Sequence, residues 1–231
     1  MKIICLALAF WFFLSNFSAA SPGQIQLLDF DPKALPAEIR YKGEIVAGAR
    51  WLDKNGENLL LLCQTGPLKS PRQELGEDDT KDARLDAYHY VKDKKRYRLL
   101  WKLYDHIDSC RFDLTAVFIR KSLTVTDLDG NGIAESTFMY RLGCRSDIHP
   151  LQLKLIMHEG QAKYALRGET LVNVGAPPGG GPDRIIGGLN TIDPAFHRAP
   201  KVFLGHALKQ WKSFEKDKLR AEVGEEYAGE D

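Results

Sequence analysis

The chain has 231 residues, which is enough for one domain of ordinary size with a substantial core. Its 32 lysines and arginines are almost balanced by 31 aspartates and glutamates. Proteins that hold nucleic acid usually carry a basic excess on one face, so this balance argues against a nucleic-acid partner.

The N-terminus has the three parts of a cleavable secretory signal peptide. Lys2 supplies the positive charge, residues 3–14 form an uninterrupted apolar stretch, and small residues at 18–20 suit a signal peptidase. The apolar stretch is shorter than the ~20 residues that span a bilayer core. We therefore expect residues 1–20 to be removed, no transmembrane segment in the mature chain, and export to the periplasm or the medium.

Three cysteines remain after such cleavage: Cys63, Cys110 and Cys144. An odd count in an exported chain predicts either one disulfide with a free thiol or no disulfide. Cys110 and Cys144 share a local context, Cys-Arg-Phe-Asp and Cys-Arg-Ser-Asp, near the ends of predicted strands. This favours a bridge between them, with Cys63 as a buried apolar residue after four leucines. The alternative is that all three are buried thiols.

Residues 21–174 are predicted to form one β domain made of hairpins. Apolar and polar residues alternate in its segments, which is typical of half-buried strands, and Asn55-Gly56 suits a tight turn. The predicted pairs are residues 43–51 with 58–64, 86–91 with 97–104, 123–126 with 136–142, and 151–157 with 164–167, with a further strand over 112–119. The fold class is therefore mainly β, an antiparallel hairpin meander arranged as propeller-like blades or as a sandwich.

The composition changes after the β domain. Residues 175–188 are rich in glycine and proline and are predicted to be a linker. Residues 189–231 are predicted to hold an amphipathic helix, over about 200–220, and an acidic tail. The apolar face of this helix comprises Leu204, Ala207, Leu208, Trp211 and Phe214. We expect the helix to dock on the β domain, and the alternative is that its apolar stripe binds a partner.

The segment from Asp127 to Glu135, Asp-Leu-Asp-Gly-Asn-Gly-Ile-Ala-Glu, carries the most specific chemistry. Oxygen donors stand at alternating positions, on the side chains of Asp127, Asp129, Asn131 and Glu135 and on the carbonyl of Ile133. Glycines between them allow the tight curl that brings such donors together. These are hard ligands of the kind that Ca²⁺ prefers. The segment predicts a structural calcium site, against the alternative of a metal-free turn.

An EF-hand does not explain this segment. The twelfth position, where an EF-hand has a bidentate glutamate, is Phe138, and the flanking residues are typical of strands. The segment resembles instead the DxDGNGxxE/D loops of FG-GAP and similar β-propeller repeats of exported proteins. That resemblance implies a calcium ion bound within a β-hairpin.

A wider resemblance covers residues 126–169, which contain TDLDGNGIAESTFMYRLGCRSD and LKLIMHEGQAKYALRGE. These sequences are similar to a group of small exported bacterial proteins whose names invoke surface polysaccharide biosynthesis. The resemblance implies association with the cell envelope and supplies no catalytic residue.

No established catalytic motif occurs in the chain. The closest candidates are Asp105 beside His106 and Asp147 near His149, while His158 precedes a predicted turn and is expected to be exposed. We therefore expect a non-catalytic cell-envelope factor or binding module, with a glycan or an envelope protein as its partner. The alternative is a secreted hydrolase that acts on envelope or extracellular polysaccharide.

A basic run is predicted at the tip of the second hairpin, and we interpret it as a solvated turn. It comprises Lys92, Lys94, Lys95, Arg96 and Arg98. If the nearby Tyr88 and Tyr90 face outward beside this turn, the ligand expected there is an acidic glycan.

Overall fold

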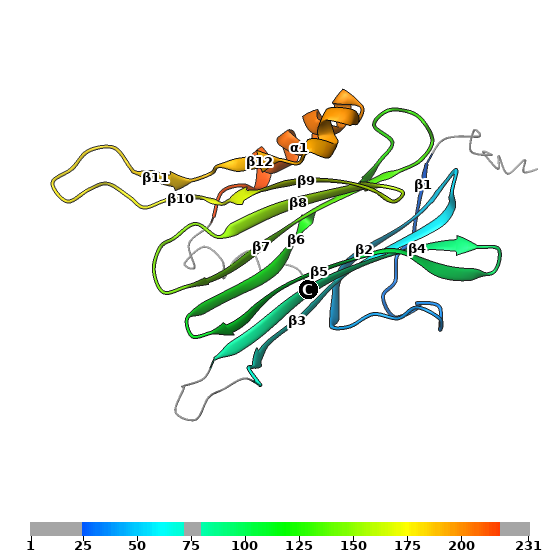
Figure 1. Cartoon of the computed structure of the whole chain (residues 1–231), viewed down its shortest axis with the longest axis horizontal. Helices are drawn as coiled ribbons and strands as arrows, with labels where there is room; N and C mark the ends of the chain where they lie inside the picture. The colour runs from blue at the N-terminus through cyan, green and yellow to red at the C-terminus, as the bar shows by residue number, and fades with distance from the viewer. Residues whose placement is uncertain (1–24, 72–79, 218–231) are drawn as a thin grey trace, which may run out of the picture.

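The computed structural model describes residues 25–71 and 80–217, which form two stacked antiparallel sheets with a helix on the outside (Figure 1). The predicted signal peptide and the acidic tail lie outside the described residues. The prediction of a mainly β, antiparallel meander with a C-terminal helix is confirmed, in its sandwich form.

The first sheet contains the N-terminal half of the described chain, and its strands are neighbours in chain order. Its strands are β1 (Gln26–Leu28), β2 (Glu44–Asp53), β3 (Gly56–Lys69), β4 (Lys81–Asp93) and β5 (Arg96–Cys110). The hairpin between β2 and β3 turns at Lys54-Asn55, one residue earlier than predicted. Gly56 begins β3 with φ of 106°, which a residue without Cβ adopts at low cost.

The second sheet has the order β12-β9-β8-β7-β6. Its strands are β6 (Asp113–Thr126), β7 (Glu135–Arg145), β8 (Gln152–Glu159), β9 (Ala162–Glu169) and β12 (Asn190–Ile192). The two segments predicted as separate strands over 112–119 and 123–126 form the single strand β6. Its pairing with β7 is irregular between Ile119 and Thr124.

The glycine- and proline-rich residues 175–188 lie largely in the projecting turn of a two-stranded ribbon, β10 (Leu171–Asn173) with β11 (Ile185–Gly187) (Figure 1). The chain then returns to the second sheet, because β12 pairs with β9. A 3-10 helix, η1 (Pro194–Arg198), and the helix α1 (Lys201–Phe214) follow.

Three apolar clusters hold the layers together. The largest lies between the sheets and includes Trp51 and Leu62 from one sheet with Phe138 from the other. The second lies between the second sheet and the helices, and the third lies between the outer face of the first sheet and the segment around Ile39. Burial of each face of each sheet gives four layers, because an uncovered apolar face would remain in water.

The apolar stripe of α1 docks on the second sheet. Phe203, Ala207 and Trp211 are buried there, whereas Leu208 remains 40% exposed. Burial of Trp211 favours the predicted docking role over a free stripe that would bind a partner. Among the described residues, no helix is long and apolar enough to cross a membrane.

The helix is shorter than the predicted range of 200–220, because it ends at Phe214. The next residues bond to β10: the Leu171 N–H donates to the Glu215 carbonyl at 2.6 Å, and the Asp217 N–H donates to the Leu171 carbonyl at 2.9 Å. The Arg141 guanidinium also binds the carbonyl of Phe214 at 3.1 Å. These contacts with distant strands draw the chain out of the helical path.

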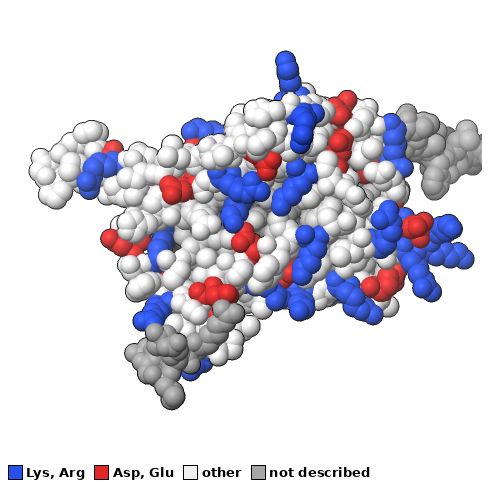
Figure 2. All heavy atoms as spheres, viewed as in Figure 1, with Lys and Arg blue, Asp and Glu red and all other residues white. Residues whose placement is uncertain are grey.

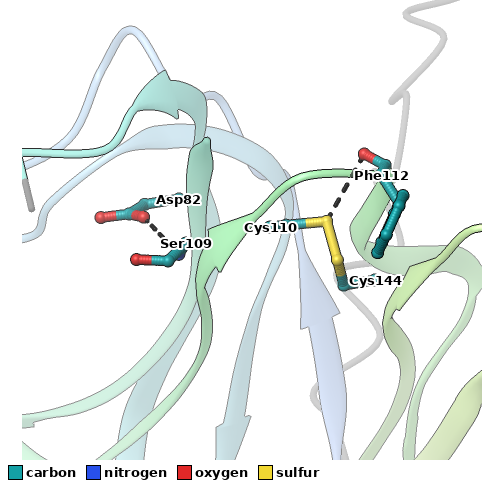
Figure 3. Close-up of a disulfide and its surroundings, with 5 residues drawn as sticks. All are labelled: Asp82, Ser109, Cys110, Phe112 and Cys144. Carbon is teal, nitrogen blue, oxygen red and sulfur yellow. Dashed lines mark hydrogen bonds between the residues drawn. A yellow bond between two sulfur atoms is a disulfide. The ribbon is translucent and has the colours of Figure 1, made fainter. Parts of the chain in front are cut away.

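The predicted cysteine pair is at bonding distance, with 2.10 Å between the sulfur atoms of Cys110 and Cys144 (Figure 3). Cys110 ends β5 and Cys144 lies near the end of β7, so the bridge joins one sheet to the other. Beside it, the Ser109 N–H donates to the Asp82 carboxylate at 2.8 Å. Cys63 is a free, buried thiol.

Tyr88 and Tyr90 do lie on the outer face of the first sheet, but they are not available to a ligand. They are only 5% and 6% exposed because the segment around Ile39 covers them. The backbone N–H of Lys42 and that of Arg40 donate to their hydroxyl groups, each at 3.2 Å. A glycan therefore cannot bind to exposed faces of these two tyrosines, contrary to what the sequence pattern suggested.

Candidate metal centre

The predicted calcium loop connects β6 to β7, at one end of the sandwich. The last register pair between the two strands is Thr126 with Glu135, so the loop closes directly on the sheet. Gly130 and Gly132 have φ of 72° and 83°, in the left-handed region that glycine adopts without strain. The glycines thus supply the curl that the sequence pattern predicts.

Three carboxylates converge inside this curl. Asp127, Asp129 and Glu135 each offer an oxygen, and these three oxygens lie within 4.8 Å of one another. Like charges this close repel strongly unless protons or a cation neutralise them. The arrangement has the spacing and the hard oxygen donors of a calcium site.

Glu135 is the most buried member of the group, with no exposed surface. One oxygen, Oε2, accepts from the Leu128 N–H at 2.9 Å and from the Thr126 hydroxyl at 3.1 Å. The other, Oε1, is buried and has no hydrogen-bond partner. Burial raises the pKa of Glu135 to about 7, and Asp129 adds to the rise, although the two hydrogen bonds oppose it. A bound cation would favour the ionised form.

Asp127 shows the same division of its two oxygens. Its Oδ2 accepts from the Gly132 N–H at 3.1 Å, while its Oδ1 is buried without a partner. Buried oxygens without a donor cost free energy, about 1–3 kcal/mol each. A cation between Asp127 Oδ1 and Glu135 Oε1 would satisfy both.

The other predicted ligands take different positions. The Asn131 side-chain oxygen accepts from the Ile133 N–H at 2.7 Å. Its amide nitrogen donates to Asp129 at 3.1 Å and to Glu159 at 2.5 Å. Asn131 and the Ile133 carbonyl therefore stay predictions as ligands.

Glu159 is a residue of this site that the sequence pattern did not indicate. It is the register partner of Glu135 across β7 and β8, which places a fourth carboxylate beside the loop. To find Glu159 from the sequence, one would have to know the register in which β8 pairs with β7. The alternation of apolar and polar residues does not define that register.

The hairpin between β2 and β3 also reaches the loop, from the opposite sheet. The Lys54 N–H donates to the Gly132 carbonyl at 2.9 Å, and its ammonium group donates to the Asn131 carbonyl. The Asp53 carboxylate accepts from the Ala134 N–H at 3.2 Å and from the Trp51 indole at 3.0 Å. The loop thereby joins the two sheets.

We expect Asp53→Ala to lower the free energy of unfolding by about 1–3 kcal/mol, because it leaves the indole N–H of fully buried Trp51 without an acceptor. Urea unfolding followed by tryptophan fluorescence measures this change. Asp53→Asn retains an acceptor oxygen and should lose less. Equal midpoints for wild type and Asp53→Ala would show that this contact adds nothing to stability.

The loop also contacts the helical layer, because Leu128 packs against the cluster that contains Phe203 and Trp211. One nine-residue segment therefore touches the first sheet, the second sheet and the layer that covers the second sheet. An ion that ordered this segment would stabilise all three contacts.

The imidazole of His106 does not bind Asp105, and Asp147 and His149 are joined through the backbone, where the His149 N–H donates to the Asp147 carbonyl at 2.8 Å. The Asp105 carboxylate accepts from the Tyr140 hydroxyl at 2.9 Å and from the Lys154 ammonium at 2.5 Å. The His106 imidazole lies instead 3.3 Å from Asp108. The expectation that His158 is exposed is wrong: it is 5% exposed because its ring stacks on Trp101 of the other sheet, with 3.9 Å between centroids.

No family model, curated protein or solved structure matches the chain.

Proposed function

We propose that the protein is an exported, non-catalytic binding module or cell-envelope factor whose sandwich is braced by a structural Ca²⁺ ion in the loop between β6 and β7. The observation that carries the proposal is the convergence of Asp127, Asp129 and Glu135 with two buried, unpartnered oxygens among them. Carboxylate oxygens without a hydrogen-bond donor are suitable ligands for a hard cation such as Ca²⁺.

The position of the loop supports a structural role for the ion. The loop lies where the β2–β3 hairpin meets the second sheet, through Lys54 and Asp53. The bond between Cys110 and Cys144 is compatible with the oxidising compartment that export implies. Millimolar calcium outside the cytoplasm would keep a site of modest affinity filled.

We expect calcium to raise the melting temperature of the protein. Ligand at 100 times its dissociation constant stabilises a folded protein by about 2.7 kcal/mol, or about 5–10 °C for a chain of this size. Differential scanning calorimetry in calcium and in excess chelator measures the shift. Asp129→Ala should abolish the shift, because it removes one of the three converging carboxylates. The fold should tolerate the change, since Asp129 is exposed and its hydrogen bonds are to Asn131 of the same loop.

Glu169→Ala is the matched control, because it removes an exposed carboxylate from β9 and should leave the calcium shift unchanged. Identical melting curves in calcium and in chelator would reject the calcium site. Turnover of a polysaccharide by the purified protein would reject the non-catalytic proposal in favour of a secreted hydrolase.

A further inference from the structure

The basic run predicted at the second hairpin lies on the projecting turn between β4 and β5 (Figure 1). β4 ends at Asp93 and β5 begins at Arg96, so Lys94 and Lys95 form the tip. Arg98 is two residues further along β5, opposite Val91. The calcium loop and its contacts do not involve this hairpin tip.

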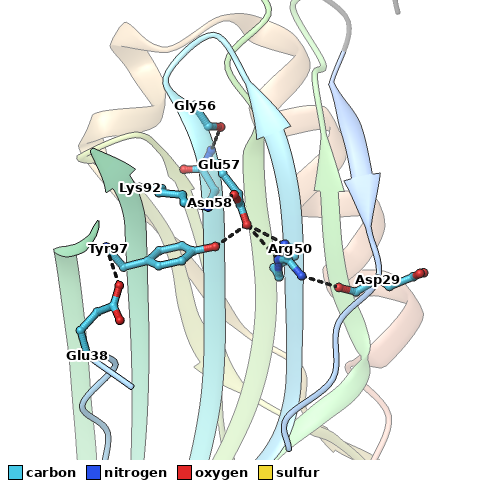
Figure 4. Close-up of polar contacts among 8 residues, drawn as sticks. All are labelled: Asp29, Glu38, Arg50, Gly56, Glu57, Asn58, Lys92 and Tyr97. Atoms are coloured by element: carbon cyan, nitrogen blue, oxygen red, sulfur yellow. Dashed lines mark hydrogen bonds and ion pairs between the residues drawn. The ribbon is translucent and has the colours of Figure 1, made fainter. Parts of the chain in front are cut away.

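Two residues at the base of the hairpin are already engaged by Glu57 (Figure 4). Its carboxylate accepts from Lys92 at 2.8 Å, from Arg50 at 2.6 Å and from the Tyr97 hydroxyl. Burial alone would raise the pKa of Glu57, but hydrogen bonds from Lys92, Tyr97 and Arg50 outweigh it and lower the pKa to about 2. This ionised cluster makes a firm base for the tip.

The four cations beyond this base have no such partner. Lys94, Lys95, Arg96 and Arg98 are all exposed, and none of their side chains forms a hydrogen bond or an ion pair within residues 25–71 and 80–217. The nearby carboxylates are Asp93, on the tip itself, and Glu38, whose pKa is lowered by hydrogen bonds from backbone N–H groups and, to a lesser extent, by Arg96. The tip therefore keeps a net positive charge.

Figure 2 shows these cations as a dense group of blue side chains at the end of the molecule that carries this hairpin. An open hollow of about 520 Å³ lies among them, lined by Asp93, Lys94, Lys95, Arg96, Tyr97 and Arg98. The protein as a whole is nearly neutral, so the concentration of charge at this tip is local.

The turn itself is unusual in its choice of residue. Lys94 has φ of 55°, in the left-handed region where glycine or asparagine is ordinarily found. A lysine there is conformationally strained, whereas glycine would adopt the same backbone without strain. A strained lysine at a position where glycine would be free of strain points to a role for the lysine side chain.

We propose that this hairpin tip is the ligand-binding surface of the module and that its ligand is an anionic polysaccharide, recognised through carboxylate groups along the sugar chain. This inference rests on the binding-module proposal and names its ligand class. The cations occupy three successive positions of the chain, 94–96, and a fourth on β5 at Arg98, and such a row of charges suits a polymer with repeated charges. Between Asp93 and Arg98 the only apolar ring is that of Tyr97, which is half-buried and hydrogen-bonded to Glu57.

Binding to polygalacturonate, measured by isothermal titration calorimetry on the purified protein, tests this proposal. The titration is done in chelator, so that calcium cannot bridge carboxylates of the protein to those of the polymer. We expect the triple variant Lys94→Gln, Lys95→Gln, Arg98→Gln to bind at least about tenfold more weakly. Its affinity should also depend less steeply on salt, because a protein with fewer cations displaces fewer counterions from the polymer when it binds.

A control variant carries the same change in net charge elsewhere: Lys33→Gln, Lys201→Gln, Lys209→Gln, all at exposed positions. It should bind as the wild type does. Equal losses in the two triple variants would mean that only net charge matters, and the proposed surface would be rejected. Equal binding to neutral dextran would reject recognition of charge.

Lys94→Gly separates the side chain's role from the fold. Glycine relieves the strain at φ of 55°, so the melting temperature should stay the same or rise while affinity for polygalacturonate falls. Unchanged affinity in this variant would argue against the role of Lys94. Binding to anionic phosphatidylglycerol vesicles without binding to polygalacturonate would overturn the proposal in favour of a lipid surface. Failure of the calcium site would appear in the melting curves alone, so the two proposals fail separately.

Discussion

Acid should destabilise the folded protein steeply, because two buried histidines must stay neutral in the fold. Burial lowers the pKa of His89 and that of His158 from 6.5 to about 3, and nearby Lys163 contributes at His158. The unfolded chain binds protons on these imidazoles below pH 6.5, whereas the folded chain does so only near pH 3. The stability present above pH 6.5 is therefore lost as the pH falls towards 3.

The expected size of this effect is large. At pH 4.5 each imidazole should cost about 3 kcal/mol, so the pair lowers the free energy of unfolding by on the order of 5 kcal/mol. Both rings contact Trp101: His158 stacks on it at 3.9 Å, and His89 lies edge-on at 5.2 Å. His89 also bonds Asn58 at 2.9 Å. Protonation would place two cations in this apolar layer between the sheets.

Urea unfolding at a series of pH values measures the effect, with variants that keep the local contacts. His158→Phe retains a ring against Trp101, and His89→Gln retains a partner for Asn58. The double variant should lose stability much less steeply between pH 6.5 and 4. Glu135, whose pKa is raised by burial, works in the opposite direction, so the comparison is made between variant and wild type at each pH. Parallel profiles would contradict the prediction.

Reduction of the disulfide should lower the free energy of unfolding by about 3–4 kcal/mol. The sequence separation of Cys110 and Cys144 is 34 residues, and closing a loop of that length removes much of the entropy of the unfolded chain. The bridge also joins the end of β5 in one sheet to β7 in the other, so its loss frees the crossover between the two sheets.

Urea midpoints of oxidised and reduced protein measure this change, and Cys144→Ala should behave like the reduced form. Cys63→Ala is the control: the difference between oxidised and reduced protein should persist in it. Cys63 is buried, and burial raises the pKa of its thiol to about 12, which keeps it from reacting as a thiolate. Coincident midpoints for oxidised and reduced protein would show that the bridge does not constrain the unfolded chain.

The features that were predictable from the sequence are local ones. Alternation along residues 151–157 defined a strand, and Leu153 and Leu155 indeed face the helical layer. The carboxylates of Asp127, Asp129 and Glu135 converge because nine consecutive residues with two glycines contain the whole curl. The apolar stripe of α1 was readable for the same reason, since a helix brings residues three and four apart onto one face.

Other features depend on which elements pack together, and periodicity carries no information about that. His158 lies beside a turn, yet it is buried because Trp101 of the other sheet covers it. Tyr88 and Tyr90 face outward from their sheet, but a segment from the N-terminal side of the chain closes over them. Burial is decided here by strands and segments distant in sequence, whose order only the folded chain reveals.

The sequence by itself thus determined the hairpins, the docking helix, the cysteine pair and the three carboxylates of the loop, all of which follow from short-range spacing or local context. Only the tertiary structure decided that Lys54 and Glu159 border the loop and that α1 ends at Phe214, where Arg141 binds its last carbonyl. The physical reason is that these contacts join residues far apart in the chain. They are brought together by the pairing of strands within a sheet and by the packing of one layer on another, and no single segment encodes either.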